Sequence, residues 1–208
     1  MKRRVGILIS GRGSNMVALI DAAARPDYPA EIALVIANRA DAGGLAIAAQ
    51  KGVATRVIAS REFGVDRAAH EAAVDAALRE AGCEFVCLAG YMRLLTPLLV
   101  QRWAGQMINI HPSLLPAFPG LDTHQRALAA GVKIHGCTVH LVTDGMDEGP
   151  ILAQAAVPVC PDDDELGLAS RVLAQEHRVY PAALAALITG LATATAVESV
   201  LVNPCVSG

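Results

Sequence analysis

The chain has 208 residues, of which 53% are hydrophobic and 18% charged, a composition that excludes a disordered protein. The formal net charge is -3 and no face gathers Lys and Arg, so we expect no nucleic-acid partner. The most apolar tract, residues 182–197, is shorter than a membrane span and interrupted by Gly190, which predicts a helix end plus connector and no membrane insertion. Five cysteines without a C-x-x-C pair favour reduced thiols in a cytoplasmic protein.

Strand and helix patterns alternate along the chain. Residues 4–10 form an apolar run typical of a buried parallel strand, and a helical pattern follows at 15–24. The last helical tract, 164–187, contains Pro181, where we expect a bend. Further strands are predicted at 31–37, 55–59, 84–89, 107–110, 137–142 and 151–159, and further helices at 42–51, 66–81, 97–103 and 123–130.

This alternation predicts an α/β fold in which helices cover both faces of a mostly parallel, twisted sheet. No linker-like stretch divides the chain, so we expect a single domain over residues 1–208. Ligands of such sheets bind beyond the carboxyl ends of the strands. Polar residues that follow strands are therefore the candidates for function.

The first such place is Gly-Arg-Gly-Ser-Asn, residues 11–15, between the first strand and the first helix. Glycine lets the backbone turn tightly, we expect Ser14 and Asn15 to cap the helix, and free N–H groups at a helix start favour an anion. The loop lacks the third glycine of a dinucleotide site and the lysine of a Walker loop, so a monophosphate fits better than NAD. A tight turn without a ligand is the alternative.

The second place is the segment 108–116, where polar residues interrupt an apolar run. Asn109 and His111 are two apart, so on an extended segment both side chains point to one side. Two converging donors are what an oxyanion needs. A histidine satisfied within the core is the alternative, and a Ser113 nucleophile is disfavoured because no G-x-S-x-G elbow surrounds it.

The third place is the acidic segment 140–150, with Asp144, Asp147 and Glu148. A solvated loop is the bland alternative. The carboxylates lack a calcium-loop spacing and the histidines lack an H-E-x-x-H pair, so we expect no metal. A carboxylate that meets His111 in space would favour its imidazolium form and orient the ring.

Five segments together make the chain similar to folate-dependent formyltransferases, and within them to the glycinamide ribonucleotide branch. They are GRGSN (11–15), LAGYMRLL (88–95), INIHPSLLPAFPG (108–120), HGCTVHLVTDGMDEGP (135–150) and QEHRVYP (175–181). The resemblance implies a Rossmann-like formyltransferase fold whose N-terminal half binds phosphate and whose C-terminal half binds folate and carries catalysis. It also implies that the enzyme moves the formyl group of 10-formyltetrahydrofolate to the amine of glycinamide ribonucleotide, in de novo purine biosynthesis, without a metal.

The resemblance also implies roles for single residues. The implied catalytic residues are Asn109, His111 and Asp147. The implied ribonucleotide-binding residues are Gly13, Ser14 and Asn15 at the phosphate and Glu176 at the ribose. The implied folate-binding residues are Arg67, Met92, Arg93, Leu94, Leu95, Asn109, Thr143 and Asp144, with the loop 143–147 closing over the pterin.

In the implied reaction the neutral amine attacks the formyl carbon, and Asn109 and protonated His111 stabilise the oxyanion. Three alternatives stay open: a formyltetrahydrofolate hydrolase, a transfer-RNA formyltransferase and a catalytically silent nucleotide-binding module. The two enzymes usually carry an added N-terminal or C-terminal domain, which we do not expect here. The sequence leaves open whether the protein is a monomer or a homodimer, and what His70 and Asp122 do beside the site.

Overall fold

The structure is a computed structural model that describes residues 1–190. Within them, one sheet of seven strands has the order β3-β2-β1-β4-β5-β6-β7. The strands are β1 (Arg3–Ile9), β2 (Ala30–Ala37), β3 (Thr55–Val57), β4 (Phe85–Leu88), β5 (Met107–His111), β6 (Ile134–Leu141) and β7 (Ile151–Pro158). Every strand predicted from the sequence is present.

The sheet is mostly parallel, as predicted. Strands β1 to β5 pair in parallel, since a helix or a long crossover connects one to the next. Strand β6 reverses direction and runs antiparallel to β5, and β7 runs antiparallel to β6. The reversal places Asn109 of β5 directly opposite His140 of β6.

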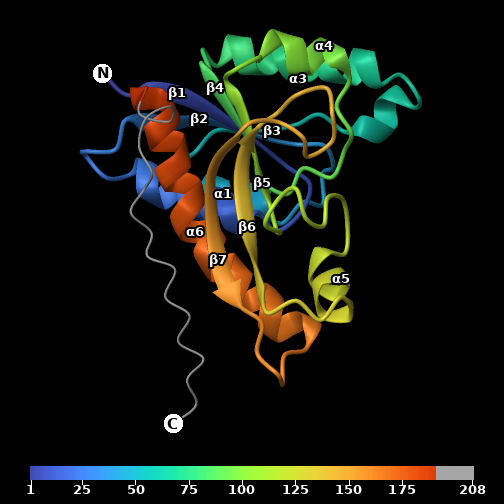
Figure 1. The fold of residues 1–208 in the computed structure, drawn as a ribbon. Helices are drawn as coiled ribbons and strands as arrows, with labels where there is room; N and C mark the ends of the chain where they lie inside the picture. Colours follow the sequence, from blue (N-terminus) through green and yellow to red (C-terminus); the bar gives the residue numbers. More distant parts are fainter. Residues whose placement is uncertain (191–208) are drawn as a thin grey trace.

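Helices cover both faces of the sheet (Figure 1). They are α1 (Ser14–Ala23), α2 (Gly44–Gln50), α3 (Arg67–Glu80), α4 (Pro97–Arg102), α5 (Thr123–Ala129) and α6 (Glu165–Thr189). On one face, α1 and α6 bury side chains such as Leu19 and Val172. On the other, α3 and α4 bury Leu78, Leu99 and their neighbours. This confirms the two-faced α/β architecture.

Close packing of α3 on β1 depends on Gly6. A Cβ atom at this position would lie 2.2 Å from Cδ2 of Leu78, which is closer than two carbon atoms can approach. Glycine therefore lets the helix that begins at Arg67 lie directly against the central strand. A larger residue would push α3 away from the sheet.

Two features of the structure differ from the sequence prediction. Helix α6 continues through Pro181 to Thr189, and the rest of the predicted connector, residues 191–197, lies outside the described residues. A short 3-10 helix, η1 (Ser60–Phe63), was not predicted. Across residues 1–190, every helix falls short of the length or the apolar character that crossing a bilayer would take.

Candidate functional site

The glycine loop after β1 forms a small polar pocket. Gly13 has φ 70°, in the left-handed region that favours glycine, and occupies the N-cap position of α1. The prediction that Ser14 and Asn15 cap the helix is wrong, because the helix begins at Ser14 and no side chain caps it. The first N–H groups of α1 are therefore left for an external acceptor, which suits an anion. The pocket has a volume of about 190 Å³ and is lined by residues 11–15 with Ala89 and Gly90.

Asn15 joins this loop to the distant helix α6. Its Nδ2 donates to Oε2 of Glu176 at 2.6 Å, and both residues are buried. Burial raises the pKa of the Glu176 carboxyl, and the hydrogen bond from Asn15 acts in the opposite direction. Oδ1 of Asn15 has no partner among the described residues. The structure thus brings two of the residues predicted to bind the ribonucleotide into direct contact.

A larger groove of about 800 Å³ runs between α1 and α6, and it shares only Ser14 with the glycine-loop pocket. Its other lining residues belong to α1, α6 and the turn 25–29 that follows α1. None of the residues predicted for catalysis lines it. The groove is therefore not the place where the predicted site residues meet.

Asn109 and His111 lie within β5 itself, with their side chains toward one side, as the spacing predicts. Asn109 Nδ2 lies 3.2 Å from Nε2 of His140 on the neighbouring strand. The other nitrogen of His140, Nδ1, lies 2.9 Å from the carbonyl oxygen of Leu141 and must donate to it. In a neutral ring Nε2 then accepts the amide N–H of Asn109, which fixes the orientation of that amide.

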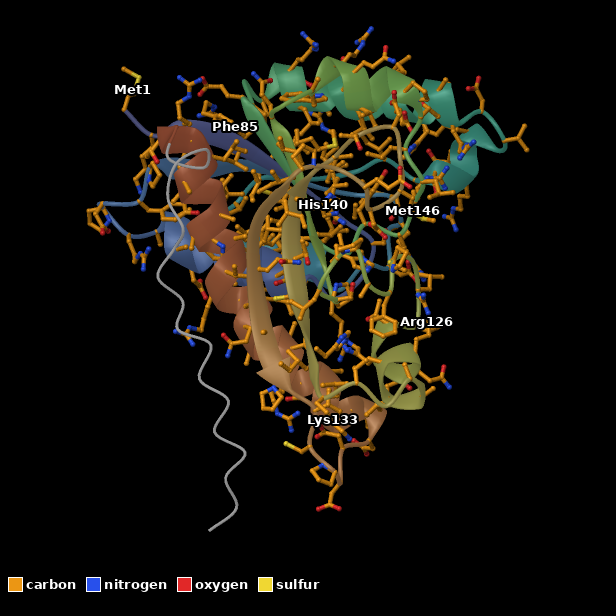
Figure 2. The ribbon with its side chains drawn as sticks, in the orientation of Figure 1. Met1, Phe85, Arg126, Lys133, His140 and Met146 are labelled. Carbon is orange, nitrogen blue, oxygen red and sulfur yellow. The ribbon has the colours of Figure 1, made fainter. Side chains whose placement is uncertain are left out.

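Burial keeps His140 in this neutral form. The residue is 2% exposed, and this burial lowers the pKa of the imidazole, against smaller raising effects of the Leu141 carbonyl and Asp147. Figure 2 shows His140 on β6 and Met146 in the loop beyond that strand. One N–H of the Asn109 amide is bound to His140, and the second remains to donate to a ligand.

His111 is buried and held between two oxygen atoms. Its Nε2 lies 3.0 Å from the carbonyl oxygen of Phe118, so this nitrogen donates. Its Nδ1 lies 3.4 Å from Oδ2 of Asp147. Because that second contact is longer than a strong charged hydrogen bond, Nδ1 is the ring atom that a ligand can engage.

Asp147 organises three segments. Its Oδ2 accepts the N–H of Gly120 at 2.9 Å and its Oδ1 lies 3.7 Å from Nε2 of His140. Its backbone φ is 58°, in the region that non-glycine residues rarely occupy. Residues in such strained conformations persist where the surroundings hold them, and functional sites are common places for them.

The turn after His111 is fixed by Thr138 on β6. Its Oγ1 donates to the carbonyl of Ser113 at 2.7 Å and accepts the N–H of Leu115 and the side-chain amide of Gln154, each at 3.0 Å. Ser113 is fully buried, and its hydroxyl donates to the carbonyl of Ala117. These contacts argue against a Ser113 nucleophile, in agreement with the sequence.

The residues predicted to bind folate are more scattered. Met92 and Leu94 are 66% and 62% exposed, with Arg93 and Leu95 half-buried between and beyond them. Thr143 and Asp144 are exposed in the loop after β6, beside Met146, which is 58% exposed. Arg67 is exposed at the first turn of α3, and no side-chain contact in the described part of the chain joins it to the other predicted residues.

His140 is not among the predicted site residues, although it lies in the quoted segment 135–150. The local sequence shows only that His140 lies on a strand, two residues after Thr138. The pairing of His140 with Asn109 depends on the reversal of β6. The sequence left open the roles of two further residues, His70 and Asp122. His70 is buried against Phe63 and bound to the carbonyl of Ile58, and Asp122 is the exposed residue that precedes α5.

The described part of the chain contains no group of three or more His, Cys, Asp or Glu side chains arranged to hold a metal ion. The cluster of Asn109, His111, His140 and Asp147 instead provides hydrogen-bond donors and one carboxylate. Together with the anion pocket after β1, it defines a Rossmann-like α/β protein with the groups that acyl transfer requires.

A family model described as formyl transferase matches residues 3–184, and the chain therefore belongs to the formyl transferase family. The phosphoribosylglycinamide formyltransferase of Escherichia coli (strain K12) is 44% identical over 175 residues, which are 84% of this chain and 82% of that protein. The crystal structure of the phosphoribosylglycinamide formyltransferase from Brucella melitensis shares 54% identity and a TM-score of 0.86, covering 96% of this chain and 100% of that one.

Some relatives are much longer. The trifunctional purine biosynthetic protein adenosine-3 of Homo sapiens is 46% identical over 189 residues, which are 91% of this chain and 19% of that protein. This chain spans less than a fifth of the length of these trifunctional relatives, and 14% of the one from Drosophila melanogaster. The similarity therefore concerns one part of each of those proteins.

Proposed function

We propose that this protein transfers the formyl group of 10-formyltetrahydrofolate to the amine of glycinamide ribonucleotide in purine biosynthesis. The observation that carries the proposal is the cluster of Asn109, His111 and Asp147, with the last two 3.4 Å apart beside the amide. The membership of the chain in the formyl transferase family supports the same reaction class. Relatives that share most of their length with the chain bear the name of this enzyme.

In this reaction the neutral amine of the ribonucleotide attacks the formyl carbon, and a tetrahedral intermediate with a negative oxygen forms. The free N–H of Asn109 and the Nδ1–H of His111 donate to that oxygen. One such donor contributes roughly 3–4 kcal/mol in other acyl-transfer sites. Collapse of the intermediate breaks the bond to N10 of the folate, which takes up the proton that the attacking amine releases. No covalent enzyme intermediate is needed.

Asp147 orients the imidazole of His111 and stabilises its charged form as the oxyanion develops. It also holds the loop after β6 against Gly120, so that this loop covers the reacting atoms. A water molecule beside the carboxylate would carry the proton between the two nitrogens. His140 contributes indirectly, because it holds the amide of Asn109 in one orientation.

The two substrates occupy different parts of the sheet edge. The phosphate binds at Gly13, Ser14 and Asn15, where the uncapped start of α1 suits an anion, and Glu176 binds the ribose. The pterin lies on the exposed apolar surface of Met92 and Leu94, with Arg93, Leu95, Thr143 and Asp144 around it. Arg67 contacts the folate from the first turn of α3.

The remaining expectations stay predictions. We expect no metal requirement, a cytoplasmic location and a monomer or homodimer. We also expect the N-terminal half to bind phosphate and the C-terminal half to bind folate and carry catalysis, within a single domain over residues 1–208.

An absorbance assay tests the proposal. The protein is mixed with 10-formyltetrahydrofolate, with and without glycinamide ribonucleotide, and the loss of the formyl group is followed. Loss that requires the ribonucleotide supports the transferase. Equal loss without it identifies a hydrolase, and no loss in either mixture contradicts both enzymes.

A further inference from the structure

We infer that Ser10 and Glu71 are positioning residues for the formyl donor, because they hold the two ends of the segment Met92–Leu95, here named the donor loop. The inference rests on the proposed function, in which this loop lies against the pterin. Neither residue lies in the cluster around His111. Ser10 contacts the backbone of the donor loop, and Glu71 contacts Thr96, the residue that follows the loop. Ser10 and Glu71 are far apart in the sequence.

The start of the donor loop is held by Ser10, the residue after β1. Ser10 is 8% exposed, and its N–H donates to the carbonyl of Gly90 at 3.1 Å, which extends the pairing of β1 with β4. Its Oγ then accepts the N–H of Met92 at 2.8 Å. The hydroxyl therefore reaches beyond the last strand pair and fixes the first residue of the loop.

The end of the loop is held by Glu71 on α3, which is 3% exposed. Its Oε1 accepts the N–H of Thr96 at 2.8 Å, and its Oε2 accepts the Thr96 hydroxyl. Thr96 is the N-cap residue of α4 but makes no side-chain cap bond to that helix. A buried carboxylate is tolerated when its oxygens are hydrogen-bonded, so these two bonds fix the loop where α4 begins.

Between these two anchors the loop is supported by Leu95, which packs against the hydrophobic cluster under α3 and α4. Within residues 1–190 the backbone of residues 93–95 makes no hydrogen bond. Met92 and Leu94 face outward, as their exposure shows, whereas Tyr91 lies buried beneath. The outer side of the loop is therefore apolar at Met92 and Leu94. An apolar outer side of this size suits a flat aromatic ring.

A substitution of Glu71 tests the donor site independently of the ribonucleotide site. It contacts Thr96 and has no contact with residues 11–15, whereas Ser10 directly precedes that loop. Loss of Glu71 should therefore weaken only the formyl donor. Loss of the Ser10 hydroxyl should weaken the donor as well, with a smaller effect on the ribonucleotide.

The test compares Glu71→Met with Glu71→Gln. Methionine removes both acceptors and leaves the half-buried N–H of Thr96 unpaired. Glutamine keeps two bonds, because its Oε1 accepts the N–H of Thr96 and its Nε2 donates to the Thr96 hydroxyl. For Glu71→Met we expect KM for 10-formyltetrahydrofolate and Kd for tetrahydrofolate to rise about tenfold, about 1.4 kcal/mol, as loss of a buried hydrogen bond predicts. KM for the ribonucleotide and kcat should stay within about twofold, and Glu71→Gln should restore donor binding.

Asp75→Asn is the matched control. Asp75 is a buried carboxylate one turn further along α3 and is bound to Arg79, Arg102 and Trp103, with no contact to the donor loop. It should lower Tm about as much as Glu71→Met but leave KM and Kd for the folates unchanged. Ser10→Ala provides the second test if Glu71→Met does not fold.

Two results overturn the inference: Glu71→Met and Ser10→Ala binding tetrahydrofolate as tightly as the unchanged protein, or Asp75→Asn weakening it equally. Either would mean that the buried carboxylate serves stability alone. If the unchanged protein transfers no formyl group to the ribonucleotide, the proposed function fails. The binding of tetrahydrofolate to the same variants still decides the role of the donor loop.

Discussion

Nδ1 of His111 lies 3.4 Å from Oδ2 of Asp147, although the two residues are on different segments and 36 positions apart (147 − 111). The same carboxylate oxygen accepts the N–H of Gly120, so one atom links β5, the turn after it and the loop after β6. This contact places a carboxylate beside the imidazole of His111. The orientation of that ring therefore depends on the position of the loop after β6.

Replacing His111 with Ala should leave folding intact and reduce kcat by about 10²–10³, the cost of losing one oxyanion donor. The change removes the donor to the Phe118 carbonyl but leaves the side chains of the two hydrophobic clusters in place. Steady-state kinetics with both substrates and circular dichroism measure the two effects. Near-normal turnover would remove His111 from the mechanism.

Replacing Asp147 with Asn should lower kcat while KM for the ribonucleotide changes little. Asparagine keeps an acceptor for Gly120 but loses the charge that favours protonated His111. Initial rates at saturating and at limiting ribonucleotide are the measurement, because they separate kcat from KM. A variant with near-normal kcat contradicts this account of the charge.

His140 should act through Asn109. Replacing His140 with Phe keeps the ring volume but removes the acceptor that holds the amide, so kcat should fall about tenfold or more. Combined with Asn109→Ala, the second change should cost almost nothing further, because the orientation no longer matters. If the two losses in kcat are fully additive in a double-mutant cycle, His140 does not act through Asn109.

The protein should lose stability in mild acid through His135. Burial lowers the pKa of this histidine from 6.5 to about 4, so between these values the unfolded chain binds a proton that the folded chain does not. Unfolding is therefore increasingly favoured as the pH falls through this range, and stability is greatest above it. The neighbouring His124 and His111 oppose protonation in the same direction.

Thermal melts from pH 7 to pH 4 measure this effect, and His135→Gln is the comparison. Glutamine does not titrate and still offers an N–H to the carbonyl of Pro112, the partner of the histidine. Its Tm should fall less steeply with acid than that of the unchanged protein. Parallel curves would assign the acid sensitivity to other groups.

Replacing Asn15 with Ala should raise KM for the ribonucleotide and leave the Kd for tetrahydrofolate unchanged. The change removes a side chain at the phosphate pocket and takes from buried Glu176 the hydrogen bond that lowers its pKa. Calorimetric titration with each ligand separates the two sites. Weaker binding of both ligands would mean that the pockets are not independent.

The sequence predicted what periodicity and glycine placement control. Buried runs and helical spacing located the strands and helices, and the i, i+2 spacing brought Asn109 and His111 to one side. The capping of α1 was predicted wrongly. Ser14 is a favourable cap by local preference, but the left-handed backbone of Gly13 takes the N-cap position and Asn15 bonds to the distant Glu176.

Long-range pairing accounts for what the sequence did not reveal. His140 meets Asn109 only because β6 runs antiparallel to β5, against the pattern of the first five strands. The bond of Ser10 to Met92 joins residues 82 positions apart, and no local signal marks it. Such contacts depend on the order of strands in the sheet, which hydrophobic patterning does not specify.

The central claim is formyl transfer to the ribonucleotide at the cluster of His111 and Asp147. It is tested most directly with 10-formyltetrahydrofolate labelled with ¹³C at the formyl carbon, incubated with glycinamide ribonucleotide and followed by NMR. We predict that the label appears as an N-formyl group on the ribonucleotide, and that this signal forms about 10²–10³ times more slowly with His111→Ala. Label found as free formate, or transferred equally well by His111→Ala, would contradict the account.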